Sequence, residues 1–240
     1  MTSTGITSRR LLLAAATLLL GAATAWFVAR SHSAFEDVLA PVQLAMSVLV
    51  PFFGVLMVQD VRLARDGLVV RDGLVVRDGR VARDGGPSPG SRPLAGLGPA
   101  VGLALGLAVC FALAGVLLTA AGTGWPFAAR VAALVAASVL VQLIAQLVGT
   151  GCGLLIRRPG RAMAATVAVP MGVTIVLGVL DPGGGLVRWL TPVGNARSLL
   201  AGTPTAALLL VPLLWCVVPN VLGARHRVAI ARSASPGRAA

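Results

Sequence analysis

Side chains that could act as acids, bases or metal ligands are few in this chain, and they lie far apart in the sequence. Its 240 residues include 8 acidic residues, 2 histidines and 3 cysteines. Proton-coupled transport and aspartyl proteolysis both need carboxylates inside the apolar part of a membrane protein. Every acid falls instead in a polar segment or at the end of an apolar run: Glu36, Asp37, Asp60, Asp66, Asp72, Asp78, Asp84 and Asp181. The sequence therefore argues against both activities.

Metal binding and nucleophilic catalysis are disfavoured by the positions of the remaining reactive side chains. Cys110, Cys152 and Cys216 each lie in a separate apolar stretch, without the short spacing of a zinc site, and are best interpreted as small buried hydrophobic residues. His32 and His226 fall in segments that we predict on opposite faces of a membrane. We therefore expect no catalytic residue, no metal, no cofactor and no enzymatic activity.

Lysine is absent, because all 20 basic residues are arginines. A phosphate-binding Walker loop needs a lysine on the nucleotide phosphates, and Schiff-base chemistry needs a lysine amine. The chain cannot supply either group. It therefore cannot be an ATPase by itself.

The composition is that of a membrane protein. Hydrophobic residues make up 57% of the chain, charged residues only 12%, and the mean hydropathy is +0.89, whereas soluble domains carry roughly 25% charged residues. A net charge of +12 would suggest nucleic acid as the partner of a soluble protein. Here the arginines lie between apolar runs, so we expect a lipid bilayer and no nucleic acid. The lysine-free, alanine-rich composition is typical of a high-GC bacterial genome, which predicts the bacterial cytoplasmic membrane.

Six apolar runs are long enough to cross a bilayer as helices. They predict an all-α, polytopic membrane protein with helices over residues 11–29, 38–59, 100–121, 131–156, 162–180 and 205–222. The first run has a second interpretation, a cleaved signal peptide that begins at Arg9-Arg10 and ends near Ala23-Thr24-Ala25. Its apolar run is longer than the usual signal core, which favours a retained helix.

The arginines predict the orientation of these helices. With the N-terminus inside, 16 arginines fall on the cytoplasmic side, and only Arg30, Arg130, Arg188 and Arg197 fall outside. Trp26, Trp125 and Trp189 lie at the expected outer ends, where membrane proteins concentrate aromatic residues. Both signals predict that the two termini are cytoplasmic.

The predicted spans divide the chain into four parts. Residues 1–58 hold the first two spans, 59–97 form a cytoplasmic loop, 98–224 hold the other four spans, and 225–240 form a basic tail. In the loop, Arg-Asp-Gly recurs every six residues, at Arg65, Arg71, Arg77 and Arg83. Asp-Gly turns between valine-rich pieces are compatible with short hairpins, but two-stranded units are marginal alone in water. A weakly ordered, solvated repeat is the favoured interpretation.

Polar and small residues within the spans suggest how the helices pack. Gln43 and Ser47 share one helix face, as do Gln142 and Gln146. These four side chains are candidates to line a translocation path, or they form hydrogen bonds between helices. Gly98, Gly102 and Gly106 form a ladder of small residues that predicts close helix packing. Residues 181–204, before the last span, contain a glycine break and short apolar pieces, which predict either helical fragments at the outer side or an ordinary interfacial loop.

Two segments carry a resemblance to a known family. Residues 52–62 carry the second span into a polar end at Gln59, Asp60 and Arg62, and residues 191–202 precede the last span and its basic tail at 223–227. With six spans and both termini inside, this layout resembles permeases of the type-2, exporter-class ABC transporters. The resemblance implies a homodimer or heterodimer of permeases, with separate ATP-binding subunits on the cytoplasmic side.

The resemblance also implies where an ATPase subunit would bind. Candidate coupling contacts are Gln59, Asp60 and Arg62 after the second span, and Arg157, Arg158 and Arg161 after the fourth. Simple membrane anchoring by these arginines is the competing interpretation. The Arg-Asp-Gly repeat departs from the family pattern, at the place where a coupling segment is expected. The alternative function is a non-catalytic membrane anchor, or an assembly or sensor partner of another membrane complex.

Overall fold

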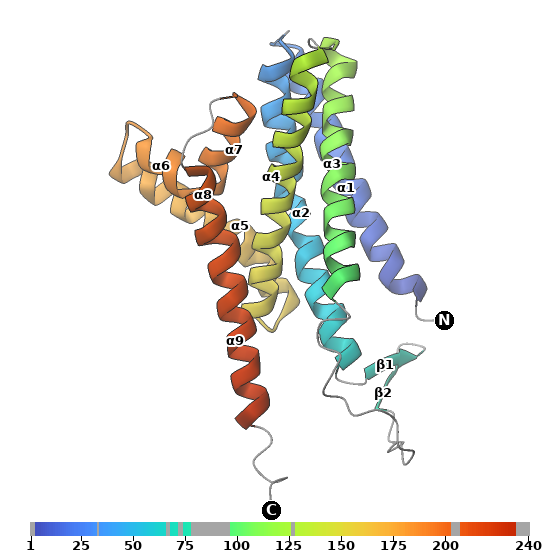
Figure 1. Ribbon diagram of the computed structural model, residues 1–240. Coiled ribbons are helices and arrows are strands. Elements are labelled where there is room, and N and C mark those ends of the chain that lie inside the picture. The colour runs from blue at the N-terminus through green and yellow to red at the C-terminus, as the bar shows by residue number, and fades with distance from the viewer. Residues whose placement is uncertain are drawn as a thin grey trace, which may run out of the picture.

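The computed structural model consists of helices, with one short hairpin outside the helical bundle (Figure 1). It describes residues 3–32, 34–65, 68–71, 74–77, 97–125, 128–202 and 207–233. The long helices are α1 (Ser3–Ala29), α2 (Phe35–Arg65), α3 (Leu97–Thr123), α4 (Ala128–Leu155), α5 (Pro159–Leu180) and α9 (Val218–Ser233). The short elements are β1 (Leu68–Arg71), β2 (Leu74–Arg77), α6 (Gly185–Leu190), α7 (Pro192–Leu200), α8 (Ala207–Pro212) and the π-helical turn η2 (Leu213–Val217).

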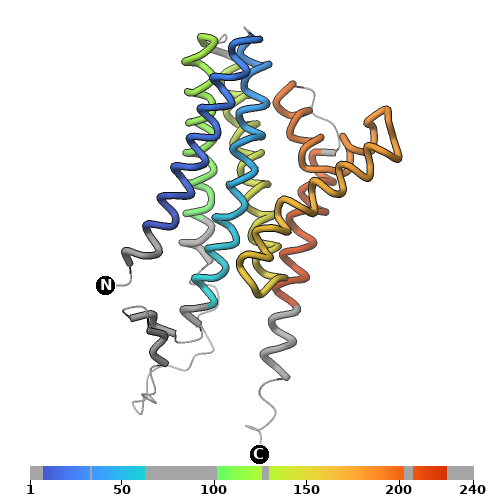
Figure 2. The backbone as a smooth tube through the Cα atoms, turned by 180° about the vertical axis from the view of Figure 1, so that it is seen from behind, coloured from blue at the N-terminus to red at the C-terminus, as the bar shows by residue number. Residues whose placement is uncertain are grey.

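The six predicted spans are confirmed as helices long and apolar enough to cross a membrane. The first five coincide with α1 to α5, and the sixth is formed by α8, η2 and α9 together. Helices α1 to α4 stand side by side, α5 tilts away from them, and α9 runs along α4 (Figures 1 and 2). The start of α1 and the end of α9 lie at the same end of the bundle, which we call the terminal end.

The centre of the bundle is the contact between α2 and α4, which is the most extensive helix pair in the described residues. A side chain at Gly149 of α4 would overlap the backbone of Pro51, and one at Gly54 of α2 would overlap the backbone of α4. Gly153, one turn further along α4, also lies close to α2, because an added side chain would come within 3.2 Å of the Val55 Cα atom. Glycines therefore let the two backbones touch, which is how membrane helices gain packing energy without a hydrophobic driving force.

Two glycines of the expected ladder on α3, Gly102 and Gly106, do not pack against another helix of this chain. A side chain added at Gly102 or Gly106 would meet no atom within 4 Å, and Gly98 lies outside the residues whose surroundings are described. Helix α3 instead packs through Phe111, which is buried beside Phe53 of α2 with ring centroids 5.4 Å apart. Within this chain, the face of α3 that carries Gly102 and Gly106 is therefore open, and close packing of the ladder stays a prediction.

The segment before the last span forms two short helices, so the helical interpretation is confirmed for residues 185–190 and 192–200. Asp181 stabilises the start of α6, because its carboxylate accepts a hydrogen bond from the Leu186 amide at 2.7 Å. Thr191 caps α7 by accepting one from the Gly194 amide at 3.0 Å, and Pro192 follows at the first helical position. Helix α7 packs against α2 and α4, so it is part of the bundle.

The last span is a helix with a wider turn in its middle. Its π-helical turn, Leu213–Val217, lies between Pro212 and Pro219. Proline lacks an amide hydrogen, so a regular helical ladder cannot continue through either residue. The Trp215 indole donates a hydrogen bond to the Leu190 carbonyl at 2.8 Å, which joins this turn to α6. Beyond the predicted span, α9 continues as a helix to Ser233.

Two copies of the repeat form an antiparallel hairpin. Leu68 of β1 pairs with Arg77 of β2, and Arg71 pairs with Leu74, so only Asp72-Gly73 connects the strands. The less favoured hairpin interpretation is therefore the one observed for these copies. The copy that begins at Arg83 lies outside the described residues.

Candidate functional site

Arg62 joins the terminal ends of α2 and α4. Its guanidinium group donates hydrogen bonds to the carbonyl oxygens of Leu154 at 3.0 Å, Ile156 at 3.3 Å and Arg157 at 3.4 Å. These carbonyls belong to the last turn of α4 and the connection to α5, where helical carbonyls lack partners within the helix. We call this the Arg62 contact. It fixes the α4–α5 turn relative to the end of α2.

The other candidate coupling residues surround the Arg62 contact. Asp60 forms an ion pair with Arg10 of α1, in which the side chains remain 29% and 34% exposed. The Gln59 side-chain nitrogen is buried and has no hydrogen-bond partner among the described residues. The candidates in the α4–α5 connection, Arg157, Arg158 and Arg161, are exposed. The structure thus brings the two predicted groups together at the terminal end of the bundle.

The polar candidates in the spans divide into two groups, and the first is a hydrogen-bonded pair. Gln43 of α2 and Gln142 of α4 are both fully buried. The Gln142 amide donates to the Gln43 side-chain oxygen at 2.7 Å, and the Gln43 amide donates to the Ala112 carbonyl of α3 at 2.9 Å. Gly115 makes room for Gln43, because a side chain there would overlap the amide. Hydrogen bonding between helices is therefore the observed role of this pair.

Gln146 and Ser47 differ from this pair and from each other. Gln146 is 1% exposed, and neither its side-chain oxygen nor its nitrogen has a partner in the described part of the chain. Ser47 donates to the Leu44 carbonyl of its own helix at 2.7 Å and lines a cavity. The four polar candidates therefore do not form one continuous row.

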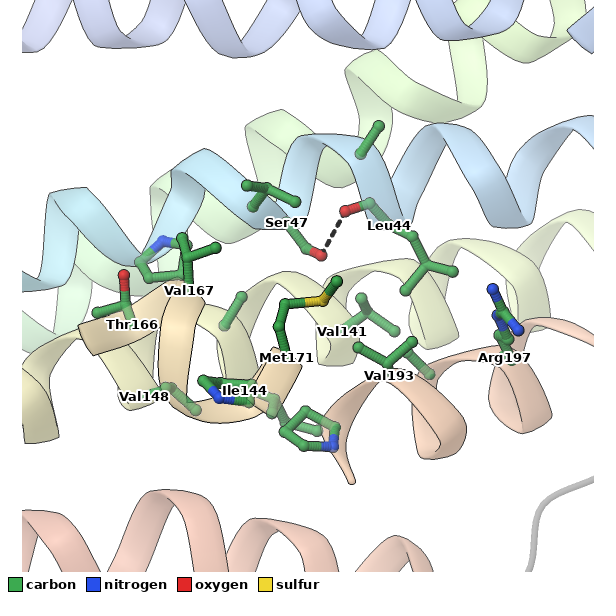
Figure 3. A pocket seen from close by; sticks show the side chains of 17 residues that line it. Leu44, Ser47, Val141, Ile144, Val148, Thr166, Val167, Met171, Val193 and Arg197 are labelled. Carbon is green, nitrogen blue, oxygen red and sulfur yellow. Dashed lines mark hydrogen bonds between the residues drawn. The ribbon is translucent and has the colours of Figure 1, made fainter. Parts of the chain in front are cut away.

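The cavity that Ser47 lines has a volume of about 350 Å³ and lies among α2, α4, α5 and α7 (Figure 3). Seventeen residues line it: Leu44, Ala45, Ser47, Val48, Pro51, Val141, Ile144, Ala145, Val148, Thr166, Val167, Pro170, Met171, Pro192, Val193, Ala196 and Arg197. Only Ser47, Thr166 and Arg197 among them are polar. This volume lies within the roughly 300–1,000 Å³ typical of small-molecule pockets.

Sequence reasoning identified Ser47 but missed the cavity. Thr166, Met171 and Ala196 are ordinary residues of apolar segments, and nothing in their spacing indicates that α2, α4, α5 and α7 leave a space between them. Arg197 was recognised only as one of the outer arginines. The short helix α7 places Arg197 at one end of the cavity, and α7 does so because Thr191-Pro192 starts that helix inside the bundle (Figure 3).

Comparison with protein-family models, with curated proteins and with solved structures finds no match for this chain. The described residues include no group of three or more histidine, cysteine, aspartate or glutamate side chains placed to hold a metal ion. Functional inference therefore depends on the membrane fold, the Arg62 contact and the cavity.

Proposed function

We propose that this chain is the membrane-spanning permease subunit of an ABC-type exporter and works with a separate ATP-binding subunit. The main support for this proposal is the helix pair α6–α7. It is inserted between the fifth and sixth spans and packs into the bundle away from the terminal end (Figure 1). Six spans with a broken hairpin before the last one is the layout that resembles type-2 ABC exporters. The proposal places the protein in a bacterial cytoplasmic membrane, with its terminal end in the cytoplasm.

The lack of lysine supports a division of labour between subunits. Transport against a gradient needs an energy source, and this chain has no Walker lysine with which to bind the phosphates of ATP. Described residues also place no acidic side chain in the middle of a span that would couple transport to protons. An ATPase bound at the terminal end would supply the energy.

The Arg62 contact would couple movement of such an ATPase to the membrane-spanning helices. A subunit bound to Arg157, Arg158 and Arg161 would press on the α4–α5 turn, which Arg62 holds to the end of α2. Helices α2, α4 and α5 also line the cavity, so a shift of that turn would change the cavity walls. ATP binding would thus favour one of two helix arrangements, because the ATP-bound subunit would bind one arrangement more tightly than the other.

A second permease copy completes the proposed transporter. Helices α1 and α5 bury only 17% and 6% of their spans within the chain. Large apolar side chains on both helices, such as Phe27 and Val179, are exposed at 75%. In a membrane these faces contact lipid or another subunit.

Co-purification tests the proposal. The full-length protein, tagged at its C-terminus, is purified from its host membrane in mild detergent, and bound proteins are identified and quantified by mass spectrometry. We expect a stoichiometric soluble subunit that contains a Walker lysine. Replacing Arg157, Arg158 and Arg161 together by glutamine should reduce that subunit at least about tenfold, since each charge-assisted hydrogen bond contributes about 1.5–3 kcal/mol.

A matched control replaces Arg30 and Arg130, which lie at the opposite end of the bundle, by glutamine. This control should retain the ATP-binding subunit. If the intact six-span protein carries no such subunit, the exporter proposal fails, and the anchor or sensor function becomes the working hypothesis.

A further inference from the structure

The cavity among α2, α4, α5 and α7 opens towards the lipid side of the bundle. Two of its lining residues, Val48 and Met171, are 44% and 51% exposed, although the α4 wall behind them is buried. The α2 and α4 walls each extend over eight residues, from Leu44 to Pro51 and from Val141 to Val148, which is roughly 10 Å along the helix. That is about a third of the hydrocarbon thickness of a bilayer. A flexible hydrocarbon chain from the membrane fits this shape.

The interior of the cavity offers no free hydrogen-bond donor. The Ser47 hydroxyl donates to the Leu44 carbonyl at 2.7 Å (Figure 3). The Thr166 hydroxyl donates to the Met163 carbonyl at 2.7 Å, so each hydroxyl bonds within its own helix. The other lining side chains, Arg197 excepted, are apolar. A polar or charged group placed here would lose its hydration without compensation, so the interior selects an apolar occupant.

One end of the cavity carries a positive charge. Arg197 of α7 lies there, at the opposite end from Thr166 (Figure 3). Within the described residues its guanidinium group makes no ion pair and no hydrogen bond, whereas Arg130 pairs with Glu36 and Arg30 stacks on Trp26, at 4.6 Å from the ring centroid. A guanidinium group presents several donors in one plane and binds phosphate through two of them.

We infer that this cavity binds an anionic membrane phospholipid, with one acyl chain between α2, α4, α5 and α7 and the phosphate on Arg197. The occupant comes from the bilayer, because the opening lies among exposed apolar side chains that face lipid. Arg197 lies in the half of the bundle away from the terminal end, so the bound lipid belongs to the leaflet opposite the termini. This inference does not depend on the exporter function, since binding needs neither an ATPase nor transport.

Native mass spectrometry of the full-length protein in detergent micelles tests the site. Phosphatidylglycerol and phosphatidylcholine with identical acyl chains are added separately, and bound lipid is counted as a function of concentration. We expect the dissociation constant for phosphatidylglycerol to be about tenfold lower, as one charge-assisted contact would give. Arg197→Gln should remove this preference, and Arg197→Lys, which keeps the charge, should retain most of it. The matched control Arg30→Gln should leave the preference unchanged.

A second variant tests the place of the acyl chain. Met171 lies in the cavity wall but is half exposed, so the larger side chain of Met171→Trp fills part of the cavity without disturbing a buried core. It should weaken binding of both lipids at least fivefold, while its thermal unfolding in detergent stays near that of the parent protein. The inference is overturned if the parent protein shows no headgroup preference, if Arg30→Gln lowers the preference as much as Arg197→Gln, or if Met171→Trp leaves binding unchanged.

Discussion

Helix α2 makes two interfaces of opposite character. On the α4 side, Gly54 and Gly149 bring the backbones into contact, and an added methyl group would overlap main-chain atoms. On the α5 side the cavity separates the two helices. Helix α5 is also open at Gly172, where an added side chain would meet nothing within 4 Å. The spans show the same contrast, since 50% of the α2 span is buried within the chain but only 6% of the α5 span.

The contrast separates a rigid part of the protein from an adjustable one. Close-packed interfaces transmit force and resist deformation, so α2 and α4 should move as a unit. Helix α5 has few buried contacts, and segments of that kind rearrange at low cost. The wall of the cavity that α5 forms should therefore move more easily than the wall that α4 forms.

The largest expected effect comes from filling the tight interface. Gly149→Ala should lower the free energy of unfolding by about 2–3 kcal/mol, because the methyl group would force the α2 backbone away. Reversible unfolding in mixed micelles, followed by circular dichroism, measures this change.

Gly172→Ala on α5 is the matched control. It should be neutral or stabilising by up to about 1 kcal/mol, because alanine is the better helix former and the site is open. Equal effects of the two substitutions would remove the distinction between the interfaces.

An intermediate effect should come from the buried amide pair. Gln43→Leu and Gln142→Leu should each cost about 1 kcal/mol, and a double-mutant cycle should give a coupling energy of roughly 0.6–1.7 kcal/mol, the range for hydrogen bonds between membrane helices. Ser47→Ala, on the cavity side of α2, should change stability by less, since its hydroxyl bonds only to its own helix. A coupling energy near zero would mean that the pair does not join the helices.

The most local effect should come from Arg62, and it should show as opening of the α4–α5 turn rather than as unfolding of the whole protein. Arg62→Gln removes guanidinium hydrogen bonds to three carbonyls, and we expect trypsin to cleave after Arg157 several times faster in the variant. Arg10→Gln, which breaks the partly exposed pair with Asp60, should leave that rate unchanged, because among the described residues the pair makes no hydrogen bond to the α4–α5 turn and surface pairs contribute only about 0–1 kcal/mol. Equal cleavage in the parent and both variants would show that Arg62 does not hold the turn.

Sequence reasoning succeeded where one residue class decides the outcome. Charge-free runs of about 20 residues located all six spans, because a charge in the hydrocarbon costs more than packing can restore. Sequence reasoning failed where the outcome depends on which helix faces meet in three dimensions. The ladder at Gly102 and Gly106 has the spacing for close packing, yet it faces open space, whereas Gly54 and Gly149 on different helices were not recognised as partners. The sequence of the repeat was likewise compatible with two interpretations, a solvated repeat and a hairpin. Only the structure shows that β1 and β2 pair.

The sequence by itself determined that the helices are apolar enough for a lipid bilayer, how many spans there are, and that no lysine is present to bind ATP. These properties depend on composition and on the length of apolar runs, which need no knowledge of neighbours. Tertiary structure decided which face of each helix is covered, that Gln43 bonds to Gln142, and that Arg197 lies at the end of a cavity. Those outcomes depend on how helices far apart in the sequence cross, and packing contacts between helices fix that crossing.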